Sequence, residues 1–408
     1  MNSNFPRGHT AFLIIHGIGD QQPFDTLDQF TRGIVDYLEP HVGHLQIEHK
    51  TSFYRGQESG SAWMKSFVRI KPKAEQDGDH WIDIHEFYWA YLTEGKISMD
   101  QVLQWLKQTI RGAIKTYEVN KEFLDANFPS LKKDNNQKNR PYWWRLNTIL
   151  RRVYWLYPIA RLLEWLLLRW IPAAIPLPQR LRQAGLRVIV DFIGDVAIYT
   201  SLDQKSRHYD VRQRILGESQ AFLEEMLERE EYDQVVVAGH SLGSVIAYDT
   251  LNRMNTKAND SLNKATEAYI RQIQKIRGLI TFGSPLDKIL FYFRPHSGDQ
   301  QYVRKQLLTN LHAFKRNKQT NELQALDSLK TGLEQNPIQQ FFDHLWWINF
   351  YDEEDPISGC LNFYEIEKDN NVKLKLGKSW GVAHNYYWGC NVFYERIFKM
   401  LLTQNPSS

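Results

Sequence analysis

The sequence has few cysteines, no long hydrophobic run and almost no net charge. Two of its 408 residues are cysteines, and two thiols cannot build a disulfide framework or a zinc site by themselves. No stretch of about 18 uncharged apolar residues is present, which argues against a membrane-spanning helix, and residues 1–10 lack the pattern of a signal peptide. The formal net charge of +3 is unlike that of a dedicated nucleic-acid binder. We therefore expect a globular, cytoplasmic protein that does not bind nucleic acid.

Motifs for metals and nucleotides are also missing. The histidines show no metal-ligand spacing, and no glycine-rich loop matches a phosphate-binding or dinucleotide-binding fingerprint. We therefore expect the protein to work without a metal or another cofactor.

Short apolar runs alternate with segments of helical periodicity. Hydrophobic residues make up 42% of the chain and charged residues 24%, which is a globular composition with ample material for a core. Strands that are apolar throughout, and that are separated by helices, are typical of a parallel sheet buried on both faces. The fold class we expect is α/β, with a mostly parallel central sheet flanked by helices. The apolar runs expected to be strands are 11–15, 235–238, 277–282 and 345–351. The segments near 46–54 and 81–91 alternate and are aromatic, so they are also expected to be strands, and a helix is expected at 179–199.

The most specific motif is G-x-S-x-G at residues 239–243, between an apolar strand and an apolar-periodic helix. Such a turn strains its central residue and lifts that side chain out of the sheet, so the flanking positions must be small. Ser241 would then stand at the N-terminus of the helix, where the dipole favours developing negative charge. The motif predicts that Ser241 is a nucleophile.

A serine nucleophile needs a base and an acid, which in this architecture follow it in the order acid, then histidine. His384 is the only histidine after the acidic turn 352–355, so chain order selects it as the base. Asp355 lies just beyond an expected sheet strand. It is the preferred acid, because the proline after it stiffens the chain. Asp352 and Asp287 are the alternatives.

An oxyanion requires two backbone N–H donors beside the nucleophile. Leu242 would supply the first donor, because it directly follows the serine. Gly17 or Ile18 would supply the second from the small-residue loop after the first strand, which His16 could brace. His240 lies inside the turn and is interpreted as structural, with its ring pointing away from the nucleophile.

An aromatic, basic segment lies in the middle of the chain. Between residues 142 and 170, 8 of 29 residues are aromatic, and 5 of the 13 tryptophans are among them. Residues 138–187 carry a net charge of +9, which leaves −6 for the rest of the chain. Tryptophan, tyrosine and arginine favour an anionic membrane interface, so we expect a peripheral contact there, with a helical lid on the core or a dimer interface as alternatives. The residues expected to contact lipid are Trp143, Trp144, Arg151, Arg152, Trp155, Trp165, Arg169 and Trp170.

Several motifs resemble known families. The G-x-S-x-G turn resembles the α/β-hydrolase superfamily of serine lipases and esterases. A finer resemblance is carried by the stretches HGIG (16–19), IGDVAIYTS (193–201), GHSLGSVIAYD (239–249), FGSPL (282–286), FYDEEDPIS (350–358) and HNYYW (384–388). These stretches resemble the DDHD-domain phospholipases, which prefer phosphatidic acid. The resemblance implies hydrolysis of an acyl ester of a glycerophospholipid, with Ser241 as the nucleophile.

Together these patterns predict one α/β-hydrolase core, formed by residues 1–95 and 206–408, with an inserted helical cap at 96–205. The expected function is hydrolysis of carboxylic esters, foremost those of lipids or phospholipids at an anionic membrane surface. An esterase or thioesterase for soluble substrates is the first alternative. A catalytically silent protein that binds membranes or a partner is the second.

Overall fold

A computed structural model describes much of the two parts of the chain that were expected to form the core, but not residues 289–344. The described residues are 5–17, 22–55, 62–73, 80–93, 207–258, 267–288, 345–355, 357–361, 364, 366–378 and 383–403, with the isolated positions 114, 118, 148 and 151. The expected cap, residues 96–205, therefore lies outside the described residues apart from those four positions, and its boundaries stay a prediction. The expected helix at 179–199 and the 193–201 motif also lie outside them.

An eight-stranded sheet forms the centre of the protein, in the order β2-β3-β4-β1-β5-β6-β7-β8. Six neighbouring strands, from β4 to β8, are parallel, while β2 and β3 form an antiparallel extension at one edge. The expected α/β class with a mostly parallel sheet is thus confirmed. The strands are β1 (His9–Ile15), β2 (Leu45–Arg55), β3 (Ala62–Pro72), β4 (Trp81–Phe87), β5 (Gln234–His240), β6 (Ile276–Phe282), β7 (Trp346–Tyr351) and β8 (Asn371–Lys373).

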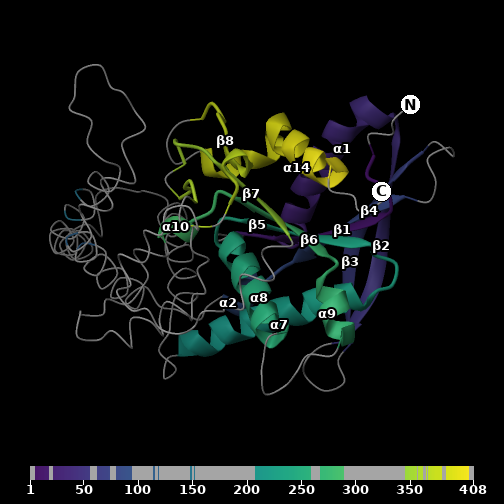
Figure 1. The fold of residues 1–408 in the computed structure, drawn as a ribbon, viewed down its shortest axis with the longest axis horizontal. Coiled ribbons are helices and arrows are strands. Elements are labelled where there is room, and N and C mark those ends of the chain that lie inside the picture. The colour runs from purple at the N-terminus through teal and green to yellow at the C-terminus, as the bar shows by residue number, and fades with distance from the viewer. Residues whose placement is uncertain are drawn as a thin grey trace, which may run out of the picture.

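Helices cover both faces of this sheet (Figure 1). Helices α1 (Asp25–Val42) and α14 (Asn391–Thr403) pack on one face, and α7 (Arg207–Glu228), α8 (Leu242–Ala258) and α9 (Glu267–Ile273) lie on the other. The shorter helical elements are α2 (Ala90–Thr93), α10 (Leu286–Lys288) and the 3-10 turns η4 (Lys368–Asn370), η5 (Ala383–Asn385) and η6 (Tyr387–Gly389).

The sequence of β1 shows why both faces are buried. Side chains alternate between the two faces of a strand, and in β1 both sets are apolar. Ala11, Leu13 and Ile15 join the core cluster under α7 and α8, whereas Phe12 and Ile14 join the cluster under α1 and α14. A continuous apolar run is therefore what a central parallel strand needs.

The chain order of the strands locates a topological switch point. After β1 the chain builds β2, β3 and β4 on one side of it, and then crosses to place β5 on its other side. In open α/β sheets, ligands bind beyond the carboxyl ends of the strands at such a reversal of strand order. The loops that follow β1 and β5 therefore form the expected position of a site.

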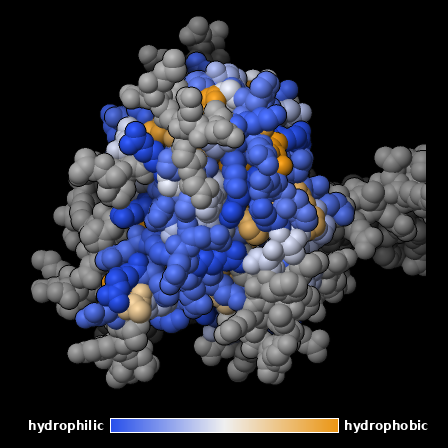
Figure 2. All heavy atoms as spheres, turned by 90° about the vertical axis from the view of Figure 1, so that its right-hand side faces the viewer, coloured by the Kyte–Doolittle hydropathy of each residue, from blue (hydrophilic) through white to orange (hydrophobic). Residues whose placement is uncertain are grey.

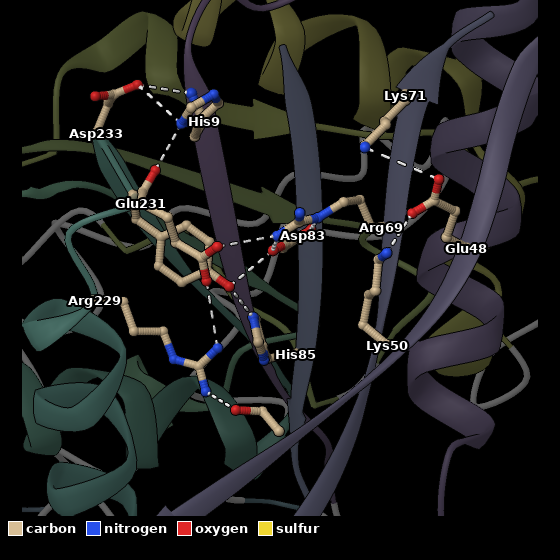
Figure 3. A network of polar contacts seen from close by, with 12 residues as sticks. His9, Glu48, Lys50, Arg69, Lys71, Asp83, His85, Arg229, Glu231 and Asp233 are labelled. Carbon is tan, nitrogen blue, oxygen red and sulfur yellow. Dashed lines mark hydrogen bonds and ion pairs between the residues drawn. The ribbon is translucent and has the colours of Figure 1, made fainter. Parts of the chain in front are cut away.

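A buried polar network ties the antiparallel edge to the centre of the sheet (Figure 3). The carboxylate of Asp83 accepts two hydrogen bonds from Arg69, each 2.7 Å long, and a third of 2.8 Å from the hydroxyl of Tyr232. That hydroxyl lies 2.8 Å from Nε2 of the buried His85. Because Asp83 is early in β4 and Tyr232 precedes β5, the network lies toward the amino ends of the strands, away from the loops that follow β1 and β5.

The free edge of β2 is protected by charge. Lys50 pairs with Glu48 at 2.7 Å on this strand, and charged side chains on an edge discourage pairing with another sheet. Figure 2 shows the side of the molecule that lies on the right in Figure 1, where the described residues are mainly hydrophilic and the apolar ones are scattered. Among the helices that the structure describes, none is both long enough and apolar enough to cross a bilayer.

Two predicted details differ from the structure. The alternating segment 81–91 was expected to be one strand, but β4 ends at Phe87 and the short helix α2 follows. The chain leaves the sheet there because the N–H of Trp89 bonds to the ring of His16 rather than to a neighbouring strand. Strand β3 was not anticipated, since Lys65, Arg69 and Lys71 interrupt its apolar pattern.

Candidate active site

Ser241 occupies the strained turn that the sequence predicts. It joins β5 to α8 with a φ of 51°, a left-handed value that, among the described non-glycine residues, only Phe24 shares. The two glycines of the motif are required by close contacts. A Cβ at Gly239 would lie 2.4 Å from Cα of Ser244, and one at Gly243 would lie 2.2 Å from the carbonyl oxygen of Ile15. The two glycines of the G-x-S-x-G motif are thus needed because α8 packs tightly against β5 and β1.

The hydroxyl of Ser241 is buried at the N-terminus of α8. The residue is 1% exposed, and within the part of the chain that the structure describes its Oγ has no hydrogen-bond partner. Its backbone N–H donates to the carbonyl of Phe282 at 3.0 Å, which fixes the turn against the end of β6. A buried hydroxyl without a protein partner is uncommon, and here it is held at the positive end of a helix dipole.

His384 and Asp355 form a buried pair beyond the ends of β6 and β7. Nδ1 of His384 donates to Oδ2 of Asp355 over 2.8 Å, the hydroxyl of Tyr387 donates to the same oxygen over 2.8 Å, and the N–H of Ile357 donates to Oδ1 over 2.9 Å. Burial by itself raises the pKa of Asp355, but the hydrogen bond and charge of His384 and the other two bonds outweigh it, so the pKa falls to about 2. The carboxylate is therefore ionised at neutral pH and leaves Nε2 as the basic nitrogen of His384.

The two alternative acids have other contacts. Asp352 accepts the N–H of Glu354 at 2.8 Å and that of Leu376 at 2.7 Å, so its carboxylate fastens its own turn to the segment after β8. Asp287 is buried in α10, where a Cβ at Gly359 would lie 2.0 Å from its carboxylate oxygen. Of the three aspartates, the structure brings Asp355 to His384.

The pair formed by His384 and Asp355 lies beside the turn of Ser241, and Gly283 lies where they meet. Gly283, at the end of β6, has a φ of +59°, and a Cβ there would lie 3.1 Å from Cε1 of His384 and 3.2 Å from Nε2 of His240. His240 directly precedes Ser241, and its ring centroid is 4.8 Å from that of His384. The absence of a side chain at Gly283 is what lets these two rings approach each other.

Two of the three residues expected to supply backbone donors lie beside Ser241. Leu242 is the first residue of α8, so its N–H has no partner within the helix. Gly17 follows β1, and a Cβ there would lie 2.7 Å from Cβ of Ser241, so this loop touches the serine. Ile18, the other expected donor, lies outside the described residues.

His16 braces the loop that carries Gly17. Its Nδ1 lies 2.7 Å from the carbonyl of Gly17, and its Nε2 lies 3.0 Å from the N–H of Trp89. Because a carbonyl only accepts and an N–H only donates, the ring is neutral with its proton on Nδ1. Burial supports this state by lowering the pKa of His16 to about 4. The indole of Trp89 returns a hydrogen bond of 3.0 Å to the carbonyl of His16.

Sequence reasoning missed Tyr387 and the contact of His240 with His384. Tyr387 lies in the HNYYW stretch but was given no role of its own, although its position three residues after His384 was the one available signal. The contact of His240 had no local signal, since the two residues are 144 positions apart.

The expected lipid-contact residues fall in the cap. Arg151 is the one that the structure describes: it is helical, exposed and paired with Glu118. The other seven lie outside the described residues, and their role stays a prediction. In the described part of the chain, no group of three or more His, Cys, Asp or Glu side chains could hold a metal ion.

Comparison of the chain with protein-family models, with curated proteins and with solved structures found no match.

Proposed function

We propose that this protein is a serine hydrolase of the α/β-hydrolase type, which cleaves carboxylic esters through a covalent acyl-enzyme. One observation carries the proposal. The buried, hydrogen-bonded pair of His384 and Asp355 packs beside the strained turn of Ser241, whose hydroxyl has no hydrogen-bond partner among the described residues. A nucleophile, a base and an acid that orients the base are the three parts that this chemistry needs.

In the first half of the reaction, Ser241 Oγ attacks the carbonyl carbon of the ester while its proton moves to Nε2 of His384. Asp355 keeps Nδ1 protonated and stabilises the imidazolium that forms. The N–H groups of Leu242 and of the Gly17–Ile18 loop bind the oxyanion of the tetrahedral intermediate. When this intermediate collapses, the ester C–O bond breaks, and the leaving alcohol takes the proton from His384.

In the second half, water is the nucleophile. Nε2 of His384 removes a proton from a water molecule, whose oxygen attacks the acyl carbon of the acyl-enzyme. Collapse of the second tetrahedral intermediate releases the carboxylic acid and returns the proton to Ser241. The enzyme is then in its starting state.

The substrate we favour is a lipid ester presented at an anionic membrane. The support comes from the sequence, in which residues 138–187 combine a charge of +9 with clustered tryptophans. Arginine beside anionic head groups contributes about 1 kcal/mol per residue. The resemblance to phospholipases points to the same substrate class.

Substitution of the serine tests the proposed chemistry. Ser241→Ala should lower kcat for p-nitrophenyl esters by roughly 10⁴-fold or more, and a fluorophosphonate probe should label the unmodified protein but not the variant. Ser219→Ala is the matched control, because Ser219 is also buried but lies on α7 and bonds to Thr250. A protein that neither reacts with the probe nor hydrolyses any ester would contradict the proposal and favour a silent binding protein.

A further inference from the structure

His240 joins the serine turn to the loop of the proposed base. Its Nε2 lies 3.0 Å from the main-chain carbonyl oxygen of His384. Because that oxygen only accepts hydrogen bonds, Nε2 carries the proton and donates it. This hydrogen bond connects the residue before Ser241 with a residue 144 positions later in the chain.

The surroundings of His240 leave its ring little freedom. It is 5% exposed, stacks on Phe282 with a centroid distance of 5.1 Å and meets Trp388 edge-on at 5.3 Å. On the side toward β1, a Cβ at Gly17 would lie 3.1 Å from its Nδ1. The loops after β1, β5 and β6 and the loop of His384 therefore meet around one imidazole.

We propose that His240 is a positioning residue for His384: its Nε2–H bond to the His384 carbonyl holds the base loop against the serine turn. The inference rests on the proposed function, since it gives His240 a part in the same reaction. His384 sits in a 3-10 turn of three residues, η5. One hydrogen bond holds the side chain of His384 to Asp355, and another holds its backbone carbonyl to His240.

A neutral donor suits this position. The ring centroids of His240 and His384 are 4.8 Å apart, so a charged group at His240 would repel the imidazolium that forms on His384 during turnover. Burial, followed by the neighbouring charge of His384, lowers the pKa of His240 to about 3, so it stays neutral at neutral pH. A lysine or an arginine could donate the same bond, but only together with that unfavourable charge.

Three substitutions separate the hydrogen bond from the packing. In His240→Gln the amide nitrogen is as many bonds from Cα as Nε2 of histidine and can reach the carbonyl. His240→Met has a similar length and no donor, and His240→Asn has a donor that is one bond too short. We expect Met and Asn to lower kcat by about 100-fold with KM changed less than about twofold, since small misplacement of a catalytic group has effects of this size. Gln should recover most of kcat.

A second readout does not depend on activity. The proton shared by His384 Nδ1 and Asp355 gives a low-field NMR resonance, which is assigned by its loss in Asp355→Asn. It should broaden or disappear in His240→Met and His240→Asn and persist in His240→Gln, in samples kept below their midpoints of thermal unfolding.

The two readouts also distinguish the failure of this inference from that of the proposed function. Equal kcat in the Gln and Met variants, or an unchanged resonance in Met and Asn, would overturn the role of His240. If the unmodified protein has no esterase activity and no probe labelling, the proposed function fails, and the resonance still decides whether His240 positions His384.

Discussion

Two aspartates three residues apart have different partners. Asp355 accepts hydrogen bonds from His384, from Tyr387 and from the backbone of Ile357. Within the described part of the chain, the carboxylate of Asp352 accepts hydrogen bonds from two backbone N–H groups, and one of them comes from the segment after β8. At the scale of the single residue, its partners therefore distinguish the proposed acid, which bonds to a histidine, from an aspartate that fastens a loop.

Asparagine at each position should separate these two roles. Asp355→Asn should lower kcat by roughly 10⁴-fold, because an amide can stabilise the wrong tautomer of His384. Asp352→Asn should keep most of the activity but lower the free energy of unfolding by about 1–3 kcal/mol, since its two backbone donors lose a charged acceptor. Ester kinetics and urea unfolding of both variants measure the difference. A larger loss of activity in Asp352→Asn than in Asp355→Asn would contradict the assignment of Asp355 as the acid.

At the scale of the element, Glu86 connects the end of β4 with the start of α1. Its Oε2 accepts the N–H of Phe24 at 2.8 Å, just before the helix begins, where Phe24 has a left-handed φ of 73°. Among the described residues its Oε1 has no hydrogen-bond partner, although it is buried. Burial, with a smaller contribution from Asp25, raises the pKa of Glu86 to about 7 against the hydrogen bonds from Phe24, Thr26 and Leu27.

This shift predicts a pH-dependent stability. The pKa of Glu86 rises from its ordinary 4.5 in the unfolded chain to about 7 in the folded protein, so the folded state binds more protons between these values. Stability from this group is therefore complete below pH 4.5 and is lost as the pH rises through 7, by about 3 kcal/mol in total. Glu86→Gln, which cannot titrate, should remove this loss in urea unfolding across pH 4.5–8.

An exposed glutamate provides the control for that measurement. Glu367→Gln, just before η4, should leave the pH dependence of stability as it is in the unmodified protein. If Glu86→Gln shows the same pH dependence as this control, Glu86 does not titrate in that range.

The elements also show where sequence patterns succeed and where they do not. The apolar runs at 11–15 and 277–282 lie within β1 and β6, because central parallel strands are buried on both faces and carry a local signal. Strand β3 was missed because Arg69 looks like a solvated residue in sequence. In the fold, its charge is compensated by Asp83, 14 positions away, which no local pattern reveals.

At the scale of the whole molecule, the sequence predicts an uneven charge distribution. Residues 138–187 carry +9 and the remainder −6, although the total is only +3. Lysine and arginine near an anionic surface act over about a Debye length, roughly 10 Å at 0.1 M salt. Any membrane attraction should therefore be local to this segment and sensitive to salt.

Co-sedimentation with vesicles tests this. Vesicles with anionic phospholipid should bind the protein at low salt and release it at high salt, while neutral vesicles should not bind it. Replacing Arg151, Arg152 and Arg169 by Gln should weaken binding by roughly 3 kcal/mol, about 1 kcal/mol per arginine. The control is the same change of charge on the core, at Arg214, Arg271 and Lys368. Equal losses in the two triple variants would exclude a local membrane contact and favour a soluble substrate.

The sequence by itself determined the parallel sheet, the strained turn at Ser241 and the identity of the one histidine that could follow the acid, because these depend on local periodicity, on steric limits near one residue and on chain order. Only the tertiary structure decided that Asp355 rather than Asp352 or Asp287 meets His384, that Tyr387 shares the carboxylate and that His240 bonds to the base loop. The physical reason is that most buried polar atoms need a partner of matching geometry. In a parallel sheet, the loops that supply these partners come together from distant parts of the chain.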